Sequence, residues 1–124
     1  MNRATNTGTP IFKAGRRLTL TDLSLLASAG VAEVHVYARL HVGVLSTGDE
    51  LREPGQPAEY WQIYDANRLM LLAMIRDIGF EAVDLGLVED SRDSVRQALD
   101  GGADRCDLII TSGGASAGDE DHIS

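Results

Sequence analysis

Three short apolar segments, separated by two amphipathic ones, constrain the fold of this chain more than any other feature of its sequence. The apolar segments are residues 42–46, 82–88 and 107–111, and turn residues bound them, as is typical of buried strands. Each intervening segment is long enough to cross over between strands, so we expect a β-α-β-α-β order with parallel strands. The predicted fold class is α/β, a three-layer sandwich in which helices cover both faces of a mainly parallel sheet.

The two amphipathic segments carry signals for where their helices begin and end. Asp65 can cap the first helix, and Gly79 can end it. Ser91 can cap the second helix, and the pair Gly101 and Gly102 is expected to stop it. Each helix should bury one face against the sheet. These faces comprise Leu69, Leu72, Ala73, Ile75 and Arg76 in the first helix and Val95, Ala98 and Leu99 in the second.

The N-terminal part of the chain follows a different pattern. Thr19 can cap a short helix, with Asp22 three residues later, and Gly30 supplies a left-handed stop. An extended piece is expected at residues 34–37. We therefore predict that residues 1–38 form a leader with one short helix, and that residues 39–124 form the α/β domain.

The composition excludes several classes of protein. Hydrophobic residues make up 44% of the 124 residues, enough for a packed core. A net charge of −8 repels phosphate backbones and anionic lipids, so we expect neither nucleic acid nor a membrane as a partner. No apolar run approaches the ~20 residues that span a bilayer, and no signal peptide is evident. With a single cysteine, Cys106, which suits a reducing compartment, these features predict a cytoplasmic protein.

Acidic residues follow all three predicted strands, at the sheet edge where parallel α/β folds bind ligands. They are Glu50, Asp90 and Asp121. Because neighbouring strands lie ~4.8 Å apart, their loops can bring these carboxylates within about a nanometre of one another. Clustered like charges are costly without a cation, and oxygen ligands suit Mg²⁺, so we predict that the three bind a metal ion. The alternative is a solvated acidic rim.

The loop after the third predicted strand, residues 112–121, is rich in glycine and serine. Its glycines let a ligand approach the main chain. Its backbone N–H groups, with the hydroxyls of Ser112 and Ser116, could bind a phosphate or another oxyanion. A tight turn that binds nothing would explain the glycines equally well.

The segment between the first strand and the first helix holds further candidates. Capping explains Asp65, whereas Asn67 lies near the positive end of the helix dipole and could have a structural or an anion-binding role. Tyr60 and Trp61 are expected to pack the surrounding loop down, with stacking on a flat ligand ring as the alternative.

Four motifs in order resemble those of one enzyme family. They are STGDEL at residues 46–51, QIYDANR at 62–68, GLVED at 86–90 and TSGGASAGDED at 111–121. With the leader from about residue 15, they resemble the molybdopterin molybdenumtransferase family, whose relatives include the C-terminal part of gephyrin. The resemblance implies Mg²⁺-dependent insertion of molybdate into adenylylated molybdopterin, with release of AMP.

The resemblance also implies roles for particular residues. It implies that Glu50, Asp90 and Asp121 are acidic active-site residues that bind Mg²⁺. It implies ligand binding by a larger set from the strand-end loops and the start of the first helix. That set is Thr47, Gly48, Asp65, Asn67, Ser112, Gly113, Gly114, Ser116 and Gly118.

The chain departs from the family's pattern in two ways. Ala115 and Ala117 stand where bulkier aliphatic residues are usual, and the sequence ends at Ser124, before the family's later segments. We therefore expect the first portion of a catalytic domain, in a homo-oligomer such as a dimer, with little turnover alone. The alternatives are a sibling branch of the same fold, either a molybdopterin adenylyltransferase or a competence-damage-type pyrophosphatase, and a non-catalytic pterin-binding or assembly module.

Overall fold

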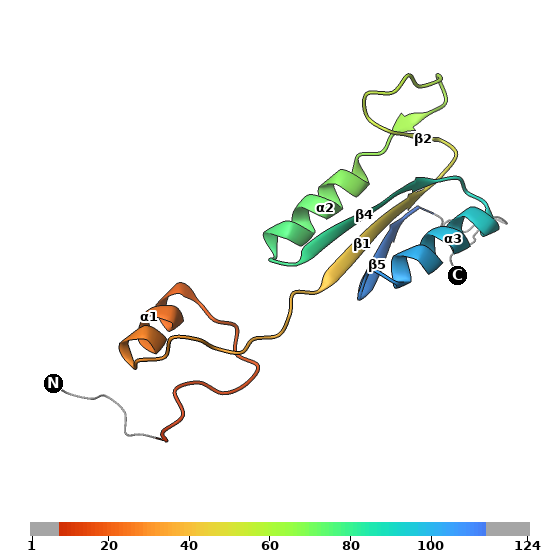
Figure 1. Ribbon diagram of the computed structural model, residues 1–124. Helices are drawn as coiled ribbons and strands as arrows, with labels where there is room; N and C mark the ends of the chain where they lie inside the picture. Colours follow the sequence, from red (N-terminus) through yellow and green to blue (C-terminus); the bar gives the residue numbers. More distant parts are fainter. Residues whose placement is uncertain (1–7, 114–124) are drawn as a thin grey trace. The chain divides into compact units, whose positions relative to one another are not determined.

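The computed structural model describes residues 8–113 and divides the chain into two compact units, Met1–Tyr37 and Ala38–Ser124. Figure 1 shows the elements of both units. Among residues 8–113, no helix is both long and apolar enough to cross a membrane. The elements are α1 (Leu20–Ser28), β1 (His41–Thr47), β2 (Leu51–Arg52), β3 (Ile63–Tyr64), α2 (Asn67–Asp77), β4 (Glu81–Val88), α3 (Arg92–Ala103) and β5 (Leu108–Ser112).

The second unit is built on a parallel sheet with the strand order β4-β1-β5. The predicted β-α-β-α-β order and the α/β fold class are therefore confirmed. The register between β1 and β4 shifts after Val44, where Leu45 pairs with Gly86. Gly86 has a φ of +83°, and its N–H donates to Asp84 Oδ1 at 2.8 Å. A bulge at this point turns the end of β4.

Helix α2 packs on one face of the sheet and forms the core with it. Val42 and Val44 of β1 pack against Leu72 and Ile75 of α2, and all four are buried. The predicted buried face is correct for Leu72 and Ile75 and wrong for three other residues. The helix is turned so that Arg68 is buried instead, which leaves its opposite side in solvent. The residues wrongly predicted as buried are Leu69, Ala73 and Arg76.

Helix α3 packs on the opposite face (Figure 1), and its predicted buried face is confirmed. The predicted stop at Gly101 and Gly102 is wrong, because the helix runs on to Ala103. Gly102 is buried, and a Cβ atom there would lie 2.8 Å from side-chain carbons of Leu85 and Ile109. The glycine therefore allows the helix to lie close to the sheet rather than ending it.

Helix α1 begins as predicted, with a capping box between Thr19 and Asp22. Arg16 also donates to both carboxylate oxygens of Asp22, at 3.1 and 3.0 Å. Hydrogen bonds from Arg16, and then from the Thr19 backbone, lower the pKa of Asp22 to about 2. Gly30 follows the helix with a φ of +83°, as predicted. Residues 34–37 form no regular strand.

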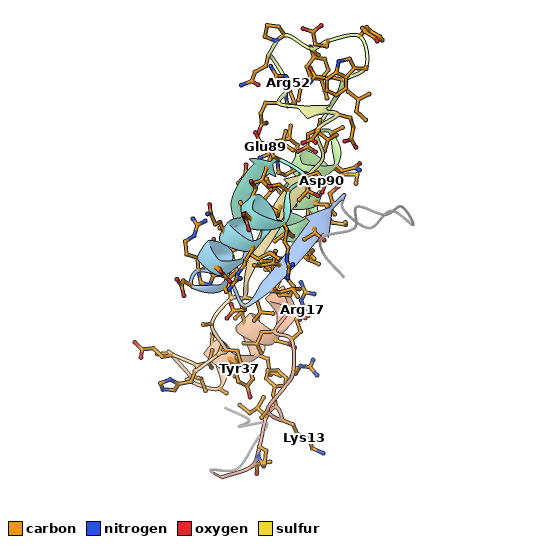
Figure 2. All side chains as sticks on the ribbon, turned by 90° about the vertical axis from the view of Figure 1, so that its right-hand side faces the viewer. Lys13, Arg17, Tyr37, Arg52, Glu89 and Asp90 are labelled. Atoms are coloured by element: carbon orange, nitrogen blue, oxygen red, sulfur yellow. The ribbon has the colours of Figure 1, made fainter. Side chains whose placement is uncertain are left out.

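The first unit also contains a largely apolar cavity of about 770 Å³. Figure 2 labels three residues that line it, Lys13, Arg17 and Tyr37. Several apolar side chains of this unit are exposed, and Leu20 is 86% accessible.

Residues 51–64, here called the β2–β3 segment, contain two short strands that the sequence analysis missed. Leu51 pairs with Ile63 and Arg52 with Tyr64, in parallel orientation. The turn between them is held by internal bonds, since the Tyr64 hydroxyl donates to the carbonyl of Gln56 at 3.0 Å. The segment lies beyond the carboxyl end of β1 and leads into α2 (Figure 1).

Candidate ligand-binding site

The loops that follow β1 and β4 are joined at the carboxyl edge of the sheet. The backbone N–H of Asp90, after β4, donates to Asp49 Oδ1, after β1, at 3.1 Å. Asp49 therefore connects the two loops, a role that the sequence analysis did not assign to it. The bond brings together two of the three loops in which the sequence analysis placed candidate residues.

A pocket of about 350 Å³ opens beside these loops. One wall is formed by the ends of β1 and β4 and the residues that follow them, and the other by the β2–β3 segment. Figure 2 labels Arg52, Glu89 and Asp90 at this end of the unit, and the first two line the pocket. The lining is mixed in charge and polarity. It comprises Gly48, Asp49, Leu51, Arg52, Glu53, Gln56, Gln62, Leu87, Val88 and Glu89.

The loops after β1 and β5 also meet, through the backbone. Gly113 has a φ of +99°, and a Cβ atom at this position would lie 2.1 Å from the carbonyl oxygen of Thr47. Only a glycine fits such a close approach at a positive φ. Predicted ligand-binding residues therefore lie side by side at this point, with Thr47 and Ser112 ending adjacent strands.

Two buried oxygens at this edge have no hydrogen-bond partner among residues 8–113. They are Thr47 Oγ1 and Asp90 Oδ1. Buried polar atoms in folded proteins are nearly always paired with protein, water or a bound group. Their position at the carboxyl edge suits contact with a polar ligand or a cation.

Of the predicted carboxylates, Glu50 and Asp90 lie within the described residues, and Asp121 lies outside them. Glu50 is exposed, and its carboxylate is folded back over Gly48, where a Cβ atom would lie 2.7 Å from Oε2. Asp90 is half-buried. Among residues 8–113, no three acidic, histidine or cysteine side chains are grouped closely enough to bind a metal ion. The predicted Mg²⁺ site stays a prediction, because its third carboxylate is not described.

Other predicted residues of the third loop also lie outside the described part of the chain. They are Gly114, Ser116 and Gly118. Ser112 ends β5 and is half-buried, and Gly113 follows it. Tyr60 and Trp61 do not pack the loop down as predicted, since they are 99% and 52% exposed. The short β2–β3 pairing, not aromatic packing, shapes that loop.

The prediction that Asp65 is the N-cap residue of α2 is wrong by one position. The N-cap residue is Ala66, which makes no side-chain cap bond, and Asn67 is the exposed first residue of the helix. Asp65 is 1% exposed, and its Oδ1 accepts from the backbone N–H of Arg68 at 3.3 Å. Asp65 therefore accepts from a free N–H of the first turn although it precedes the N-cap residue by one position.

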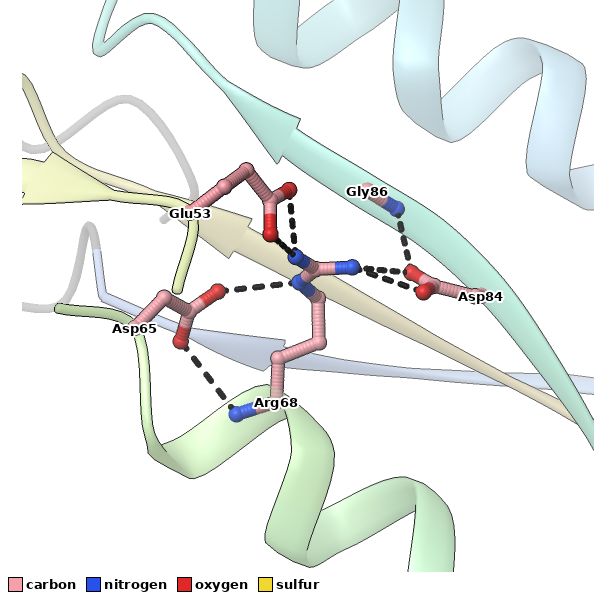
Figure 3. Close-up of polar contacts among 5 residues, drawn as sticks. All are labelled: Glu53, Asp65, Arg68, Asp84 and Gly86. Carbon is pink, nitrogen blue, oxygen red and sulfur yellow. Dashed lines mark hydrogen bonds and ion pairs between the residues drawn. The ribbon is translucent and has the colours of Figure 1, made fainter. Parts of the chain in front are cut away.

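Sequence reasoning missed Arg68, which is 3% exposed and binds three carboxylates (Figure 3). Its Nε donates to Asp65 at 2.9 Å, its Nη1 to Asp84 at 2.6 and 2.7 Å, and its Nη2 to Glu53 at 2.5 Å. Burial would lower the pKa of Arg68, but the carboxylates outweigh burial and raise it. Burial likewise acts to raise the pKa of Asp65, and the bonds from Arg68 outweigh it and lower that pKa.

A helical signal could have revealed the burial of Arg68. It lies three, four and seven residues before Leu71, Leu72 and Ile75, which is the spacing of one helix face. The charge of the side chain argued against burial, because arginine is rarely buried without a partner. Its partners come from separate parts of the chain, which one sequence does not bring together.

Comparisons with known proteins identify related sequences and structures. The family described as "Probable molybdopterin binding domain" matches residues 43–124. The chain is 45% identical to molybdopterin molybdenumtransferase of Haemophilus influenzae over 92% of its own length and 28% of that protein. It is 43% identical to molybdopterin molybdenumtransferase 2 of Mycobacterium tuberculosis, over 90% of its own length and 27% of that protein.

A solved structure is similar as well. The molybdopterin biosynthesis moea protein from Pyrococcus horikosii superposes with a TM-score of 0.73 at 33% identity, covering 83% of this chain and 26% of that one. The chain thus spans about a quarter of the length of the proteins that it matches.

Proposed function

Since the chain belongs to the molybdopterin-binding domain family, we propose that it forms part of an enzyme that inserts molybdate into adenylylated molybdopterin and releases AMP. The observation that carries this proposal is the meeting of the loops after β1, β4 and β5 at the carboxyl edge, because these loops contain family-like motifs. The relatives named as molybdopterin molybdenumtransferases support the same reaction.

We assign the phosphate-binding role to the loops after β1 and β5. The buried hydroxyl of Thr47, which has no partner among residues 8–113, can donate to a phosphate oxygen. The close approach of Gly113 to Thr47 leaves no side chain between these loops. The full proposed set is Thr47, Gly48, Asp65, Asn67, Ser112, Gly113, Gly114, Ser116 and Gly118.

We further propose that Glu50, Asp90 and Asp121 bind Mg²⁺. The donor chemistry fits, because Asp90 Oδ1 is buried without a protein partner among the described residues and carboxylate oxygens are the ligands that Mg²⁺ prefers. A bound Mg²⁺ would supply charge stabilisation for the departing adenylate. The role of the chain itself is to hold the phosphate bridge in the strand-end loops.

The cellular setting that we propose is cytoplasmic, and the proposed assembly is a homodimer.

Isothermal titration calorimetry with AMP, with and without Mg²⁺, tests the proposal. We expect AMP to bind the chain in the presence of Mg²⁺ and to bind it much more weakly without the metal. Asp90→Asn should weaken Mg²⁺-dependent binding by about tenfold or more, the cost of losing a charged partner. Asp100→Asn is the control, because Asp100 is exposed on α3 and, within the described part of the chain, forms an ion pair with Arg96 alone.

Three results would contradict the proposal. The first is the absence of binding heat both with and without Mg²⁺, and the second is an AMP affinity that is the same with and without Mg²⁺. The third is an equal effect of Asp90→Asn and Asp100→Asn, which would remove the loop after β4 from the site.

A further inference from the structure

The β2–β3 segment supplies half of the pocket lining. Its backbone is joined to the adjoining residues, since the N–H groups of Leu51 and Ile63 donate to the carbonyls of Gly48 and Glu50, and the N–H of Asp65 donates to the carbonyl of Arg52. Leu51, Arg52, Glu53, Gln56 and Gln62 line the pocket from this segment. Among the described elements, β2 and β3 pack chiefly against each other. The side-chain bonds from Arg52 to Pro57 and from Tyr64 to Gln56 stay inside the segment, so they shape it without fixing it to the sheet.

Arg68 provides the side-chain attachment that the segment otherwise lacks among residues 8–113. Its Nη2 donates to both oxygens of Glu53, a pocket-lining residue directly after β2. The guanidinium is itself fixed from two other sides, by Asp65 before α2 and by Asp84 in β4 (Figure 3). One buried side chain thus links the segment, the helix and the sheet.

We propose that Arg68 is a positioning residue that fixes the β2–β3 segment as one wall of the pocket through its ion pair with Glu53. Its consequence for ligand binding rests on the function proposed above, whereas the attachment itself does not. The inference follows from the geometry of the cluster and from the lack, among residues 8–113, of another side-chain hydrogen bond or ion pair that leads from the segment to the helix or the sheet.

The charges explain why an arginine is needed here. Three carboxylates surround one guanidinium, so the cluster carries three negative charges against one positive charge. Without Arg68, Glu53 would face two other carboxylates and would be repelled, since like charges at short range disfavour one another. A lysine could not replace it, because an ammonium lacks the planar fork that reaches three partners at once.

Trp61 gives a direct measurement of whether the segment is fixed. It is the only tryptophan of the chain and lies within the β2–β3 segment, where it is 52% exposed. We expect Glu53→Gln to raise the acrylamide quenching constant of Trp61, by at most about twofold as the side chain approaches full exposure. Fluorescence anisotropy should fall in parallel, and far-ultraviolet circular dichroism should not change.

Two further variants separate local release from general damage. Arg68→Met should increase Trp61 quenching as Glu53→Gln does, and the double variant should add little, because both changes remove the same link. Glu53 is partly exposed, so Glu53→Gln remains informative if Arg68→Met fails to fold. Asp100→Asn is the matched control, since it removes one carboxylate charge from an exposed arginine pair and should leave Trp61 unchanged.

The Trp61 test of the link between Arg68 and Glu53 is independent of the AMP-binding test of the proposed function. Unchanged Trp61 quenching in Glu53→Gln would overturn the inference, and so would additive effects in the double variant. If the attachment and the proposed function both hold, Glu53→Gln should also weaken Mg²⁺-dependent AMP binding several-fold. If the unmodified chain binds no AMP while Trp61 responds as expected, the proposed function fails and the attachment stands.

Discussion

Replacing Gly113 by alanine should destabilise the α/β unit more than the same replacement at Gly86. Both glycines have a positive φ, +99° and +83°, so each alanine is strained by about 1–2 kcal/mol. Around Gly86 a Cβ atom has open space, whereas at Gly113 it would lie 2.1 Å from the carbonyl oxygen of Thr47. That overlap with backbone adds roughly 1–3 kcal/mol. We expect a loss of about 2–5 kcal/mol for Gly113→Ala and about 1–2 kcal/mol for Gly86→Ala.

Urea unfolding followed by far-ultraviolet circular dichroism measures both values. If the slope of the unfolding free energy against urea concentration is the same for both variants and the unmodified chain, the variants change stability and not the denatured state. Equal losses for the two variants would refute the reasoning, because the overlap with the end of β1 is a cost that Gly113→Ala has and Gly86→Ala lacks. A larger loss at Gly86 would refute it as well.

Three further predictions test the packing and the charges of single elements. Because the pKa of Asp22 is lowered, its hydrogen bonds stabilise α1 fully above the ordinary pKa of 3.8, and this stabilisation is lost as the pH falls through about 2. The helical circular dichroism signal should therefore decrease over this pH range, and Asp22→Asn should abolish the decrease. Leu72→Ala should cost about 2–5 kcal/mol in urea unfolding, whereas Leu69→Ala, at an exposed position, should cost less than about 1 kcal/mol. Gly101→Ala should raise the midpoint of thermal unfolding, because alanine stabilises a helix by about 0.5–1 kcal/mol relative to glycine. Gly102→Ala should lack this gain, because its Cβ atom would lie 2.8 Å from a Leu85 side-chain carbon, which must move.

The elements with strong local signals could be predicted from the sequence. The segments 42–46, 82–88 and 107–111 predict strands because each is apolar and bounded by turn residues, and the observed strands differ from them by at most one residue at either end. Thr19 and Ser91 were identified as caps because their hydroxyls precede helical periodicity, and both accept a first-turn N–H. Parallel pairing then followed from the length of the crossovers.

The remaining features depend on contacts between distant residues. Two-residue strands such as β2 and β3 have no periodicity to detect, and their pairing becomes visible only in three dimensions. Gly102 follows the rule for a helix stop, but its close approach to Leu85 and Ile109 gives it a packing role instead. Arg68 is buried because three carboxylates bind it, and one of them, Asp84, is sixteen residues away in sequence.

The two walls of the pocket are held by different physical interactions. The wall at the ends of β1 and β4 is fixed by parallel backbone pairing and by the bond from the Asp90 N–H to Asp49 across the two loops. The opposite wall depends on a guanidinium that binds Glu53, Asp65 and Asp84. Because breaking a buried ion cluster leaves uncompensated charge, a single substitution can displace this wall while the sheet stays intact. The sheet therefore determines where the pocket lies, the β2–β3 pairing shapes its second wall, and the Arg68 cluster fixes that wall to the helix and the sheet.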